Sequence, residues 1–258
     1  MRVSLHQLHA VSVAETLTGK PGVVDLWYRY CDSIDEAERL ATLTLLTVEE
    51  RQRHGAFRFE RDRDLFLATR ALVRTVLSQY APVRPQDWRF DVEKHGKPRI
   101  SAPKVVPTIH FNLANTHGLV VCAVSIAHGL VGIDAERTDR IAEARGLAKR
   151  YFAPFETRDV LSLAGRDQQC RFFAYWTLKE SYVKARGLGL NLSLDKFGFV
   201  IGASAVEFVC PDEPMGGAGW RFALIDAPPP YQIALGADTG GADLSLRASS
   251  AGACGYTP

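Results

Sequence analysis

The sequence predicts an α+β protein of two similar halves, in which each half packs a small sheet on a long helix. Two patterns carry this prediction. A long stretch with apolar residues at helical spacing occurs once in each half, at residues 62–80 and 168–186, and short strand-like runs surround both stretches. The 258 residues are 47% apolar, which is enough for a substantial core.

The first half begins with a strand and continues with helices. Residues 23–30 (VVDLWYRY) have the β-branched and aromatic composition of a strand. Thr47, followed by Glu50 three residues later, has the pattern of a helix capping box. The helical pattern then runs to Tyr80 and is expected to end before Pro82, because proline cannot continue a helix.

Strand patterns dominate the middle and the end of the chain. Residues 88–100 contain a glycine turn flanked by extended residues. Residues 119–127 form a β-branched apolar run, and the turn at 128–129 leads into 130–136, so we expect these two strands to form a hairpin. Helical patterns follow as far as residue 186. Closing strands are expected at residues 196–202, 206–210, 220–225 and 231–237.

These patterns divide the chain into two expected halves and a tail. The first half is expected at residues 1–118, and the second half, which carries the candidate metal ligands, at 119–237. Residues 238–258 are small, polar and rich in glycine, which is typical of a disordered tail.

Charge and cysteine content narrow the function. The formal net charge is +2 and the arginines alternate with acidic residues, so no nucleic-acid partner is expected. The five cysteines are odd in number, widely spaced and without a CxxC pair, which favours reduced thiols over disulfides or a zinc site. The N-terminus lacks a signal-peptide pattern, and no apolar run approaches the ~20 residues that span a bilayer. We therefore expect a soluble cytoplasmic protein with no membrane partner.

Two carboxylates stand two residues apart in the strand pattern VGIDAE. Alternate side chains of a strand share a face, so Asp134 and Glu136 point the same way. Two such carboxylates often belong simply to the solvent-exposed face of a strand. The alternative is that they bind a metal ion. In the second long helix, Glu180 precedes Lys184 by one turn, which an exposed ion pair explains equally well. Trp176 on the same helix face indicates that Glu180 is partly covered.

Three carboxylates from a strand and a helix favour Mg²⁺ over zinc. Mg²⁺ prefers carboxylate, water and phosphate oxygens, and no His/Cys ligand cluster occurs. An open magnesium site points to phosphate chemistry. Seven arginines lie between residues 51 and 74, Lys97 is held in a tight turn, and Asn115 and Thr116 offer amide and hydroxyl donors to an anion. Most of these groups are explained equally well as exposed surface residues.

Four segments, in this order and at this spacing, make the sequence recognisable. They are HGKPRI at 95–100, FNLANTHG at 111–118, VGIDAE at 131–136 and YWTLKESYVKARGLGL at 175–190. Together they resemble the Sfp-type 4′-phosphopantetheinyl transferases, over about residues 45–205. The resemblance implies a monomeric pseudo-dimer of two α/β halves, with the co-substrate coenzyme A in the cleft between them. It also implies the reaction, in which the serine hydroxyl of an apo acyl carrier protein or peptidyl carrier domain attacks the β-phosphate of coenzyme A. Phosphopantetheine is transferred and 3′,5′-ADP leaves.

The resemblance assigns roles residue by residue. Asp134, Glu136 and Glu180 match the magnesium ligands, and Glu180 also matches the proposed general base for the serine proton. Lys184 matches a lysine that stabilises the departing phosphate, and Lys179 belongs to the same signature as a further catalytic candidate. Contacts with coenzyme A are expected at Arg53, Arg63, Lys97, Asn115, Thr116 and Thr138.

Two positions depart from the family pattern. Asn115 stands where the family has a histidine that contacts coenzyme A, and Asp64 stands where family members often have another histidine. An asparagine cannot carry charge, and an acid would repel a nearby phosphate. We therefore expect weaker coenzyme A binding than in a relative with both histidines, without loss of the chemistry.

Two other functions stay open from the sequence. One is a noncatalytic module that binds coenzyme A or a carrier protein, although binding alone does not need three carboxylates and Lys184. The other is a magnesium-dependent hydrolase of a nucleotide diphosphate, for which no distinctive motif is present. Carriers of fatty-acid, polyketide and nonribosomal peptide synthesis all remain open as partners. An acidic carrier is expected to meet residues 137–170, where Lys149 and Arg150 lie beside Tyr151.

Overall fold

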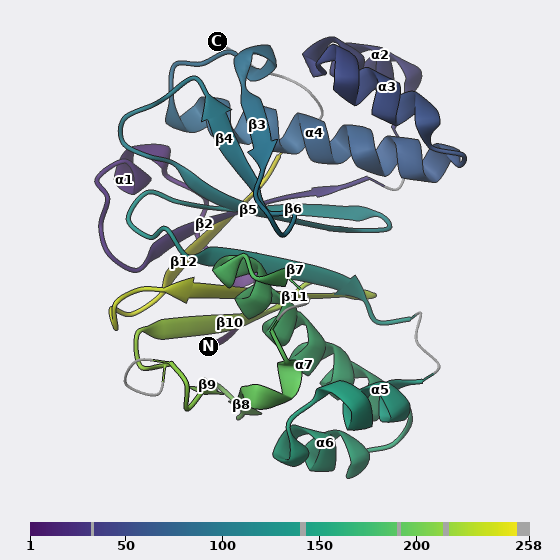
Figure 1. Ribbon diagram of the computed structural model, residues 1–258, viewed down its shortest axis with the longest axis vertical. Coiled ribbons are helices and arrows are strands. Elements are labelled where there is room, and N and C mark those ends of the chain that lie inside the picture. Colours follow the sequence, from purple (N-terminus) through teal and green to yellow (C-terminus); the bar gives the residue numbers. More distant parts are fainter. Residues whose placement is uncertain (32–33, 140–142, 190–191, 214–216, 252–258) are drawn as a thin grey trace.

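The computed structural model describes residues 1–31, 34–139, 143–189, 192–213 and 217–251 of the chain. Two four-stranded sheets lie face to face in the middle of the molecule, and a long helix covers the outer face of each (Figure 1). The predicted α+β class, with a sheet and a long helix in each half, is confirmed.

The strands of the described residues form two sheets and two short hairpins. They are β1 (Arg2–Ser4), β2 (Val23–Tyr30), β3 (Arg89–Val92), β4 (Pro98–Ala102), β5 (His110–Thr116), β6 (Leu119–Ser125), β7 (Val131–Arg137), β8 (Gly198–Ile201), β9 (Val206–Val209), β10 (Trp220–Asp226), β11 (Tyr231–Asp238) and β12 (Ser245–Ser250). The first sheet has the order β12-β2-β6-β5 and the second has the order β1-β10-β11-β7. Within the sheets, β1 with β10 and β12 with β2 are parallel pairs and the other pairs are antiparallel.

The predicted long helices lie on opposite outer faces of the two sheets. The helices are α1 (Val13–Thr16), α2 (Glu36–Leu45), α3 (Val48–Ala56), α4 (Glu60–Tyr80), α5 (Ala144–Tyr151), α6 (Pro154–Leu161) and α7 (Gly165–Arg186), of which α1 and α2 are additional to the prediction. Thr47 caps α3 as predicted, with reciprocal hydrogen bonds between Thr47 and Glu50. α7 ends at Gly187, whose φ of 64° favours glycine. None of the helices in the described ranges is long and apolar enough to cross a membrane.

The buried core follows from the alternation of side chains along the strands. On β6, Val121 and Ala123 are buried between the two sheets, whereas Val120 and Val124 turn to the outer face and pack under α4. On β10, Phe222 belongs to the cluster that α7 covers. The order of layers is therefore α4, first sheet, second sheet and α7.

The expected hairpin of residues 119–127 with 130–136 is wrong. β6 pairs with β5 through a two-residue turn at His117–Gly118, and β7 pairs with β11 in the other sheet. Gly118 has a φ of 87°, which glycine adopts at no steric cost. The predicted boundary at residue 118 therefore falls inside a hairpin. The turn pattern at 128–129 marks instead where the chain passes from one sheet to the other.

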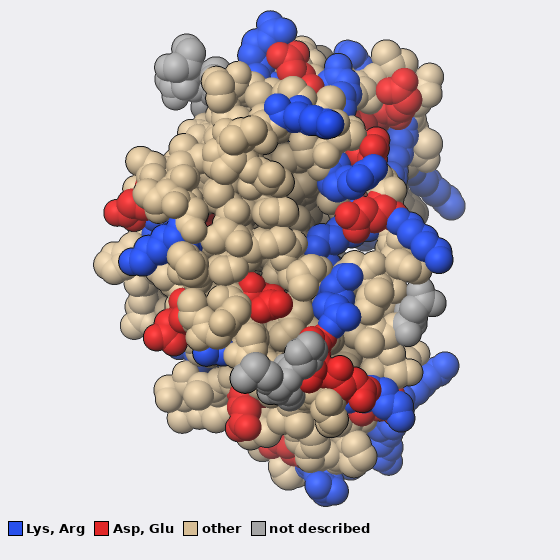
Figure 2. All heavy atoms as spheres, turned by 60° about the vertical axis from the view of Figure 1, so that its left-hand side comes forward, with Lys and Arg blue, Asp and Glu red and all other residues tan. Residues whose placement is uncertain are grey.

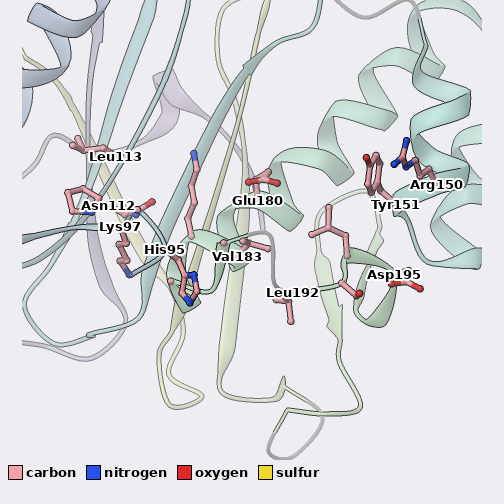
Figure 3. A pocket seen from close by; sticks show the side chains of 17 residues that line it. His95, Lys97, Asn112, Leu113, Arg150, Tyr151, Glu180, Val183, Leu192 and Asp195 are labelled. Atoms are coloured by element: carbon pink, nitrogen blue, oxygen red, sulfur yellow. The ribbon is translucent and has the colours of Figure 1, made fainter. Parts of the chain in front are cut away.

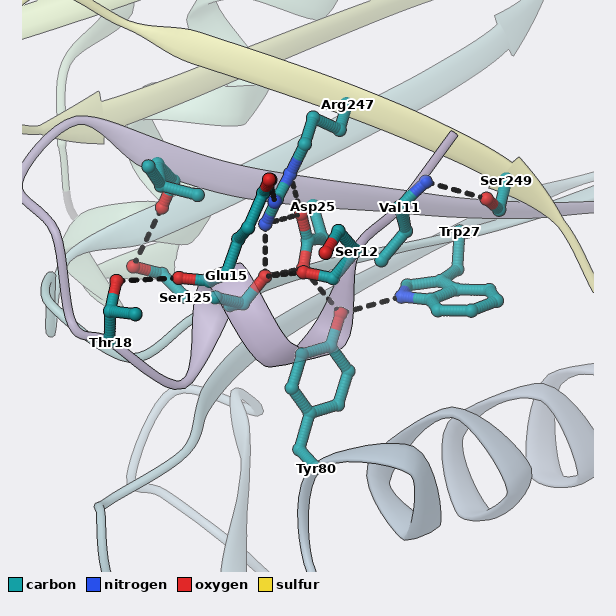
Figure 4. A network of polar contacts seen from close by, with 12 residues as sticks. Val11, Ser12, Glu15, Thr18, Asp25, Trp27, Tyr80, Ser125, Arg247 and Ser249 are labelled. Atoms are coloured by element: carbon teal, nitrogen blue, oxygen red, sulfur yellow. Dashed lines mark hydrogen bonds and ion pairs between the residues drawn. The ribbon is translucent and has the colours of Figure 1, made fainter. Parts of the chain in front are cut away.

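The expectation of a disordered tail from residue 238 is also wrong for the part that is described. Ser245–Ser250 form β12, which pairs in parallel with β2. Leu246 and Ala248 are buried between the sheets, while Arg247 turns the other way and reaches Asp25 (Figure 4). Arg247 Nε lies 2.9 Å from Asp25 Oδ1, and both side chains are buried. Strand pairing, the buried Leu246 and Ala248, and the ion pair of Arg247 with Asp25 together hold this stretch of small and polar residues.

Asp25 is the centre of a wider polar network in the first half. Tyr80 Oη donates to Asp25 Oδ2 at 2.6 Å, and Trp27 Nε1 donates to Tyr80 Oη at 2.8 Å (Figure 4). The network therefore joins β12, β2 and the end of α4. The first and last strands in sequence lie in different sheets: β12 is an edge strand of the first sheet, and β1 is an edge strand of the second. Residues 252–258 of the predicted tail lie outside the described residues.

Charged side chains on the face shown in Figure 2 gather mainly along one side and are of mixed sign. Lys and Arg alternate there with Asp and Glu, and a broad area beside them is uncharged. This pattern agrees with the formal net charge of +2 and gives no surface of a single sign on this face.

Replacing Arg247 with Met tests whether the Asp25 network holds β12 in place. The variant leaves Asp25 buried without its countercharge, so we expect the free energy of unfolding to fall by about 3–5 kcal/mol. Arg2→Met is the matched control, because Arg2 and Asp226 are each 46% exposed and such ion pairs contribute at most ~1 kcal/mol. Urea denaturation measures both variants. A loss as small for Arg247→Met as for the control would contradict this account of β12.

Candidate active site

Strand β7 and helix α7 touch each other at a glycine. A methyl group on Gly132 would overlap the backbone oxygen of Ser181 and lie 2.5 Å from the backbone nitrogen of Ala185. Only a residue without a side chain lets the helix lie this close to the strand. Gly236 pairs with Gly132 on the neighbouring strand β11, and a methyl group there would lie 2.5 Å from the ring of Phe222. The paired glycines of β7 and β11 therefore form the part of the sheet on which α7 packs.

The face of β7 that carries Gly132 also carries the predicted strand carboxylates. The odd-numbered residues from 131 to 135 are buried between the sheets, so Gly132, Asp134 and Glu136 face α7. Lys184 Nζ lies 2.6 Å from Asp134 Oδ1, and Glu180 lies one helical turn before Lys184. The close approach at Gly132 thus brings four of the predicted site residues together.

Burial and the nearby charge of Asp134 disfavour the charged forms of Glu136 and Glu180. Burial and the nearby charge of Asp134 raise the pKa of Glu136 to about 7, with Glu180 adding to the shift and Lys184 opposing it. Burial and Asp134 also raise the pKa of Glu180, again against Lys184. Asp134 Oδ2 is buried and has no hydrogen-bond partner among the described residues. A divalent cation at this point would relieve the repulsion and bind the unpaired oxygen.

The chemistry of the donors fits Mg²⁺, whose preferred ligands are carboxylate oxygens together with water and phosphate oxygens. Among the residues that the structure describes, no three Asp, Glu, His or Cys groups are close enough together to hold a metal ion. Lys184 also engages one of the two Asp134 oxygens. Binding of an ion by Asp134, Glu136 and Glu180 would therefore need side-chain movement.

A cavity of about 590 Å³ opens beside this group, between the two halves of the molecule (Figure 3). Glu180 and Lys184 line it from α7, and Lys97 lines it from the turn between β3 and β4. The remaining walls come from β5, the end of α5 and residues 192–195, with Tyr151 at the end opposite Lys97 (Figure 3). A cavity of this size accommodates a small-molecule ligand.

Two polar contacts join the halves at the cavity. Lys97 Nζ donates to the backbone oxygen of Ala185 at 2.9 Å, in the last turn of α7, where the helix dipole favours a cation. Burial lowers the pKa of the Lys97 ammonium. Asn112 of β5 accepts a hydrogen bond at Oδ1 from the Ile133 amide, also at 2.9 Å. Both contacts run from the first half to the second and fix the position of the cavity walls.

Lys179, the further catalytic candidate, does not line the cavity that Glu180 and Lys184 line. Its side chain is fully buried on another side of α7, where its Nζ lies 2.7 Å from Glu156 Oε2. Successive residues of a helix point ~100° apart, so Lys179 and Glu180 leave α7 in different directions. The helical spacing alone did not show which of the two lysines, Lys179 or Lys184, faces the strand.

Two of the predicted coenzyme A contacts meet the same part of α4. Arg53 is exposed on α3, and its guanidinium lies 5.7 Å from the centre of the Phe66 ring. Asn115 Nδ2, at the end of β5, donates to Thr69 Oγ1 at 3.3 Å. Phe66 and Thr69 are one turn apart, so Arg53 and Asn115 approach one side of α4 from two elements. Neither residue lines the cavity.

The other predicted contacts are engaged within the protein or lie at strand ends. Arg63 donates to the backbone oxygen of Phe57 at 2.9 Å, and Thr138 Oγ1 donates to the backbone oxygen of Pro230 at 3.0 Å. Thr116 is the half-buried last residue of β5. Of the six predicted contacts, the structure therefore places Lys97 in the cavity wall and leaves the others outside it.

Two residues that shape the site are additional to the prediction. Gly132 stands on the face of Asp134, and its place in the VGIDAE strand was a usable sign of close packing, because glycine inside a strand often marks a close approach of backbone. Asn112 has no such sign in the sequence. Its hydrogen bond to Ile133 depends on how the two sheets face each other.

Gly132→Ala tests the contact between strand and helix. The added methyl group meets backbone atoms of α7, which cannot move aside as a flexible side chain does. We expect the free energy of unfolding to fall by about 1–3 kcal/mol. Gly55→Ala in α3 is the control, since no atom lies within 4 Å of the added methyl group and alanine favours a helix. Urea denaturation in which both variants match or exceed the wild type would contradict the close contact.

The raised pKa of Glu136 predicts a stability that depends on pH. Well below the ordinary value of 4.5 the Glu136 carboxyl is protonated in both the folded and the unfolded state. As the pH rises from there through about 7, the unfolded state gives up its proton before the folded state does, so the free energy of unfolding falls. Glu136→Gln carries no charge. Because solvent screens part of the repulsion, we expect it to exceed the wild type in unfolding free energy by about 1–2 kcal/mol at pH 8, and to lose this advantage near pH 4. Urea titrations in EDTA at both pH values measure this, and a difference that is the same at both would refute it.

Comparison with known proteins gives matches over both halves of the chain. A family profile described as the 4′-phosphopantetheinyl transferase superfamily matches residues 130–235, and one described as 4′-phosphopantetheinyl transferase, N-terminal, matches residues 34–127. The 4′-phosphopantetheinyl transferase HetI of Nostoc sp. is 35% identical over 167 residues, which are 65% of this chain and 70% of the relative. Sfp of Bacillus subtilis is 33% identical over 64% of this chain and 70% of its own length.

A further 4′-phosphopantetheinyl transferase of Bacillus subtilis is similar over a longer stretch. It is 32% identical over 206 residues, which are 79% of this chain and 86% of the relative. The matched profile residues 130–235 include Asp134, Glu136, Glu180 and Lys184, the group that the structure brings together beside the cavity. The chain belongs to the 4′-phosphopantetheinyl transferase superfamily and is a 4′-phosphopantetheinyl transferase of the Sfp type.

Proposed function

We propose that this transferase moves the 4′-phosphopantetheine group of coenzyme A to a serine of an apo acyl carrier protein or peptidyl carrier domain, in a Mg²⁺-dependent reaction that releases 3′,5′-ADP. The observation that carries the proposal is the convergence of three carboxylates and Lys184 beside a cavity between the halves. Phosphoryl transfer needs charge neutralisation and fixed orientation more than covalent chemistry, and this group offers both.

Asp134, Glu136 and Glu180 are the residues that would hold Mg²⁺, which neutralises the charge of the diphosphate and fixes its oxygens. Of these three carboxylates, Glu180 is the one that lines the cavity. We assign it as the general base that accepts the serine proton as the serine oxygen forms a bond to the β-phosphorus. The bond from that phosphorus to the bridging oxygen breaks, and the electron pair leaves with 3′,5′-ADP.

Lys184 is the cation for the departing phosphate. It lines the cavity and lies 2.6 Å from Asp134, and this ion pair would orient the ammonium toward the charge that develops on the leaving group. Lys97, at the far wall, is restrained by Ala185 and presents a second cation to the same cavity. These two lysines would bracket the diphosphate from α7 and from the first half.

The nucleotide end of coenzyme A is assigned to the surface beside α4. Arg53, Arg63, Asn115 and Thr116 would bind the 3′-phosphate, and Thr138 would lie near the adenine. Asp64, which was expected to repel that phosphate, lies 3.0 Å from Arg39 in an ion pair. We therefore assign most of the expected weakening of coenzyme A binding to Asn115, which cannot carry a positive charge.

The carrier protein is assigned to the end of α5, which lines the cavity. Arg150 and Tyr151 line the cavity, and Lys149 beside them is exposed. Carrier proteins of this kind are acidic helical bundles, so a cationic helix end next to the site suits them. Phe152, the next residue, is buried and takes no part in this surface.

Mass spectrometry of an apo carrier protein incubated with coenzyme A and Mg²⁺ tests the proposal. We expect one phosphopantetheine per carrier, with transfer lost in EDTA. Glu180→Gln removes the base and one metal ligand, and we expect it to slow transfer by about 10²–10⁴-fold or more. Glu207→Gln is the control, because Glu207 is exposed on β9 and away from the cavity, and we expect wild-type transfer from it.

The same experiment separates the other two functions. Binding of coenzyme A without any modified carrier would indicate a binding module. Release of free phosphopantetheine, with no carrier modified, would indicate a hydrolase. Transfer that continues undiminished in EDTA would contradict the role of Mg²⁺ while leaving the transfer itself in place.

A further inference from the structure

Lys179 and Glu156 form an ion pair that is removed from solvent. Both side chains are 0% exposed, and Lys179 Nζ lies 2.7 Å from Glu156 Oε2. The same ammonium donates to the backbone oxygens of Leu194 and Phe197, each at 2.7 Å. An ammonium has three N–H donors, and all three therefore have a partner here.

Glu156 binds the same segment from the other side. Its Oε1 accepts from the Phe199 amide at 2.8 Å, and its Oε2 accepts from the Ala153 amide at 2.9 Å, at the start of α6. Between them, a methyl group on Gly198 would lie 2.5 Å from the Phe155 ring and 3.1 Å from the Glu156 carboxylate. Residues 194–199 are thus held closely between α6 and α7 by one ion pair and its hydrogen bonds.

The held segment forms one wall of the cavity. Leu192, Ser193, Leu194 and Asp195 line the cavity, and Leu192 and Asp195 are labelled in Figure 3. Glu180 lines it from α7 itself, one residue after Lys179. A single helix therefore presents Glu180 to the cavity and, through Lys179 one residue before it, restrains another part of the cavity wall.

Stability alone does not account for this pair. Removing two charges from water costs several kcal/mol, and apolar residues of similar size often stabilise a core as well as a buried ion pair does. What apolar side chains cannot do is hold the two carbonyl groups of Leu194 and Phe197 at a fixed point. The arrangement therefore fits a role in placing the wall.

We propose that Lys179 and Glu156 are positioning residues, which fix the wall at residues 192–195 so that it contacts the phosphopantetheine arm of coenzyme A. The identity of the substrate rests on the proposed function; the restraint of the wall does not. The arm is an extended chain with two amides and short alkyl links. Leu192 and Leu194 suit its alkyl parts, and Ser193 and Asp195 suit its amides.

Three variants separate positioning from catalysis and from stability: Lys179→Met, Glu156→Gln and the double variant Lys179→Met/Glu156→Leu. We expect each to raise the KM for coenzyme A about tenfold with kcat within about threefold of wild type, as for lost contacts that ground state and transition state share. The double variant is expected to recover part of the unfolding free energy that Lys179→Met loses, because it removes the unpaired buried carboxylate, while the amides of Ala153 and Phe199 lose their acceptor. Its KM is expected to stay raised, because Leu194 and Phe197 still lack their donor.

Hydrogen exchange of the free protein gives a readout that does not depend on activity. We expect faster exchange of the amides of residues 194–199 in Lys179→Met and in the double variant, with β10 and β11 unchanged. Unchanged exchange in that segment overturns the proposal. So does a double variant in which KM and stability both return to wild-type values, or a kcat that falls 100-fold at constant KM, which would make Lys179 catalytic. A wild type that transfers no phosphopantetheine would refute the proposed function, while the exchange result would still decide the restraint.

Discussion

Glu180 and Lys184 of helix α7 can meet the carboxylates of strand β7 only because Gly132 lets the helix lie directly on the strand. A side chain at that position would overlap the helix backbone at Ser181. With the glycine in place, the strand face that holds Asp134 meets the helix turn that holds Lys184, at 2.6 Å between nitrogen and oxygen. The raised pKa of Glu136 follows from the same closeness, because it reflects burial and the repulsion of Asp134. The electrostatics of the site thus depend on a packing contact that carries no charge.

The parts of the site that depend on local chain geometry were predictable from the sequence. Alternation along a strand placed Asp134 and Glu136 on one face, and helical spacing placed Glu180 and Lys184 one turn apart. The capping box at Thr47 and the long helix to Tyr80 are likewise local patterns, and both are present in the structure. Such features are fixed by residues a few positions apart, which is the range that a sequence pattern reports.

Features that depend on distant partners were not predictable in the same way. The apolar runs of β6 and β7 are adjacent in the chain, yet each finds its partners in a different sheet. β12 is small and polar, and it is held by pairing with β2 and by the bond of Arg247 to Asp25, more than 200 residues away in sequence. Lys179 has the spacing of a catalytic residue and is buried against Glu156, which spacing cannot reveal. In each case the tertiary partner decided the outcome, and local propensity did not.

The central claim is that the carboxylates beside Gly132 and the cation Lys184 act together on the diphosphate of coenzyme A with one Mg²⁺. A crystal structure of the protein with Mg²⁺ and coenzyme A measures this most directly. The account predicts one ion with an Asp134 oxygen at ~2.1 Å, further ligands from Glu136 or Glu180 and from the diphosphate, and the diphosphate within reach of Lys184. A diphosphate bound away from this group, or an ion that does not involve Asp134, would contradict it.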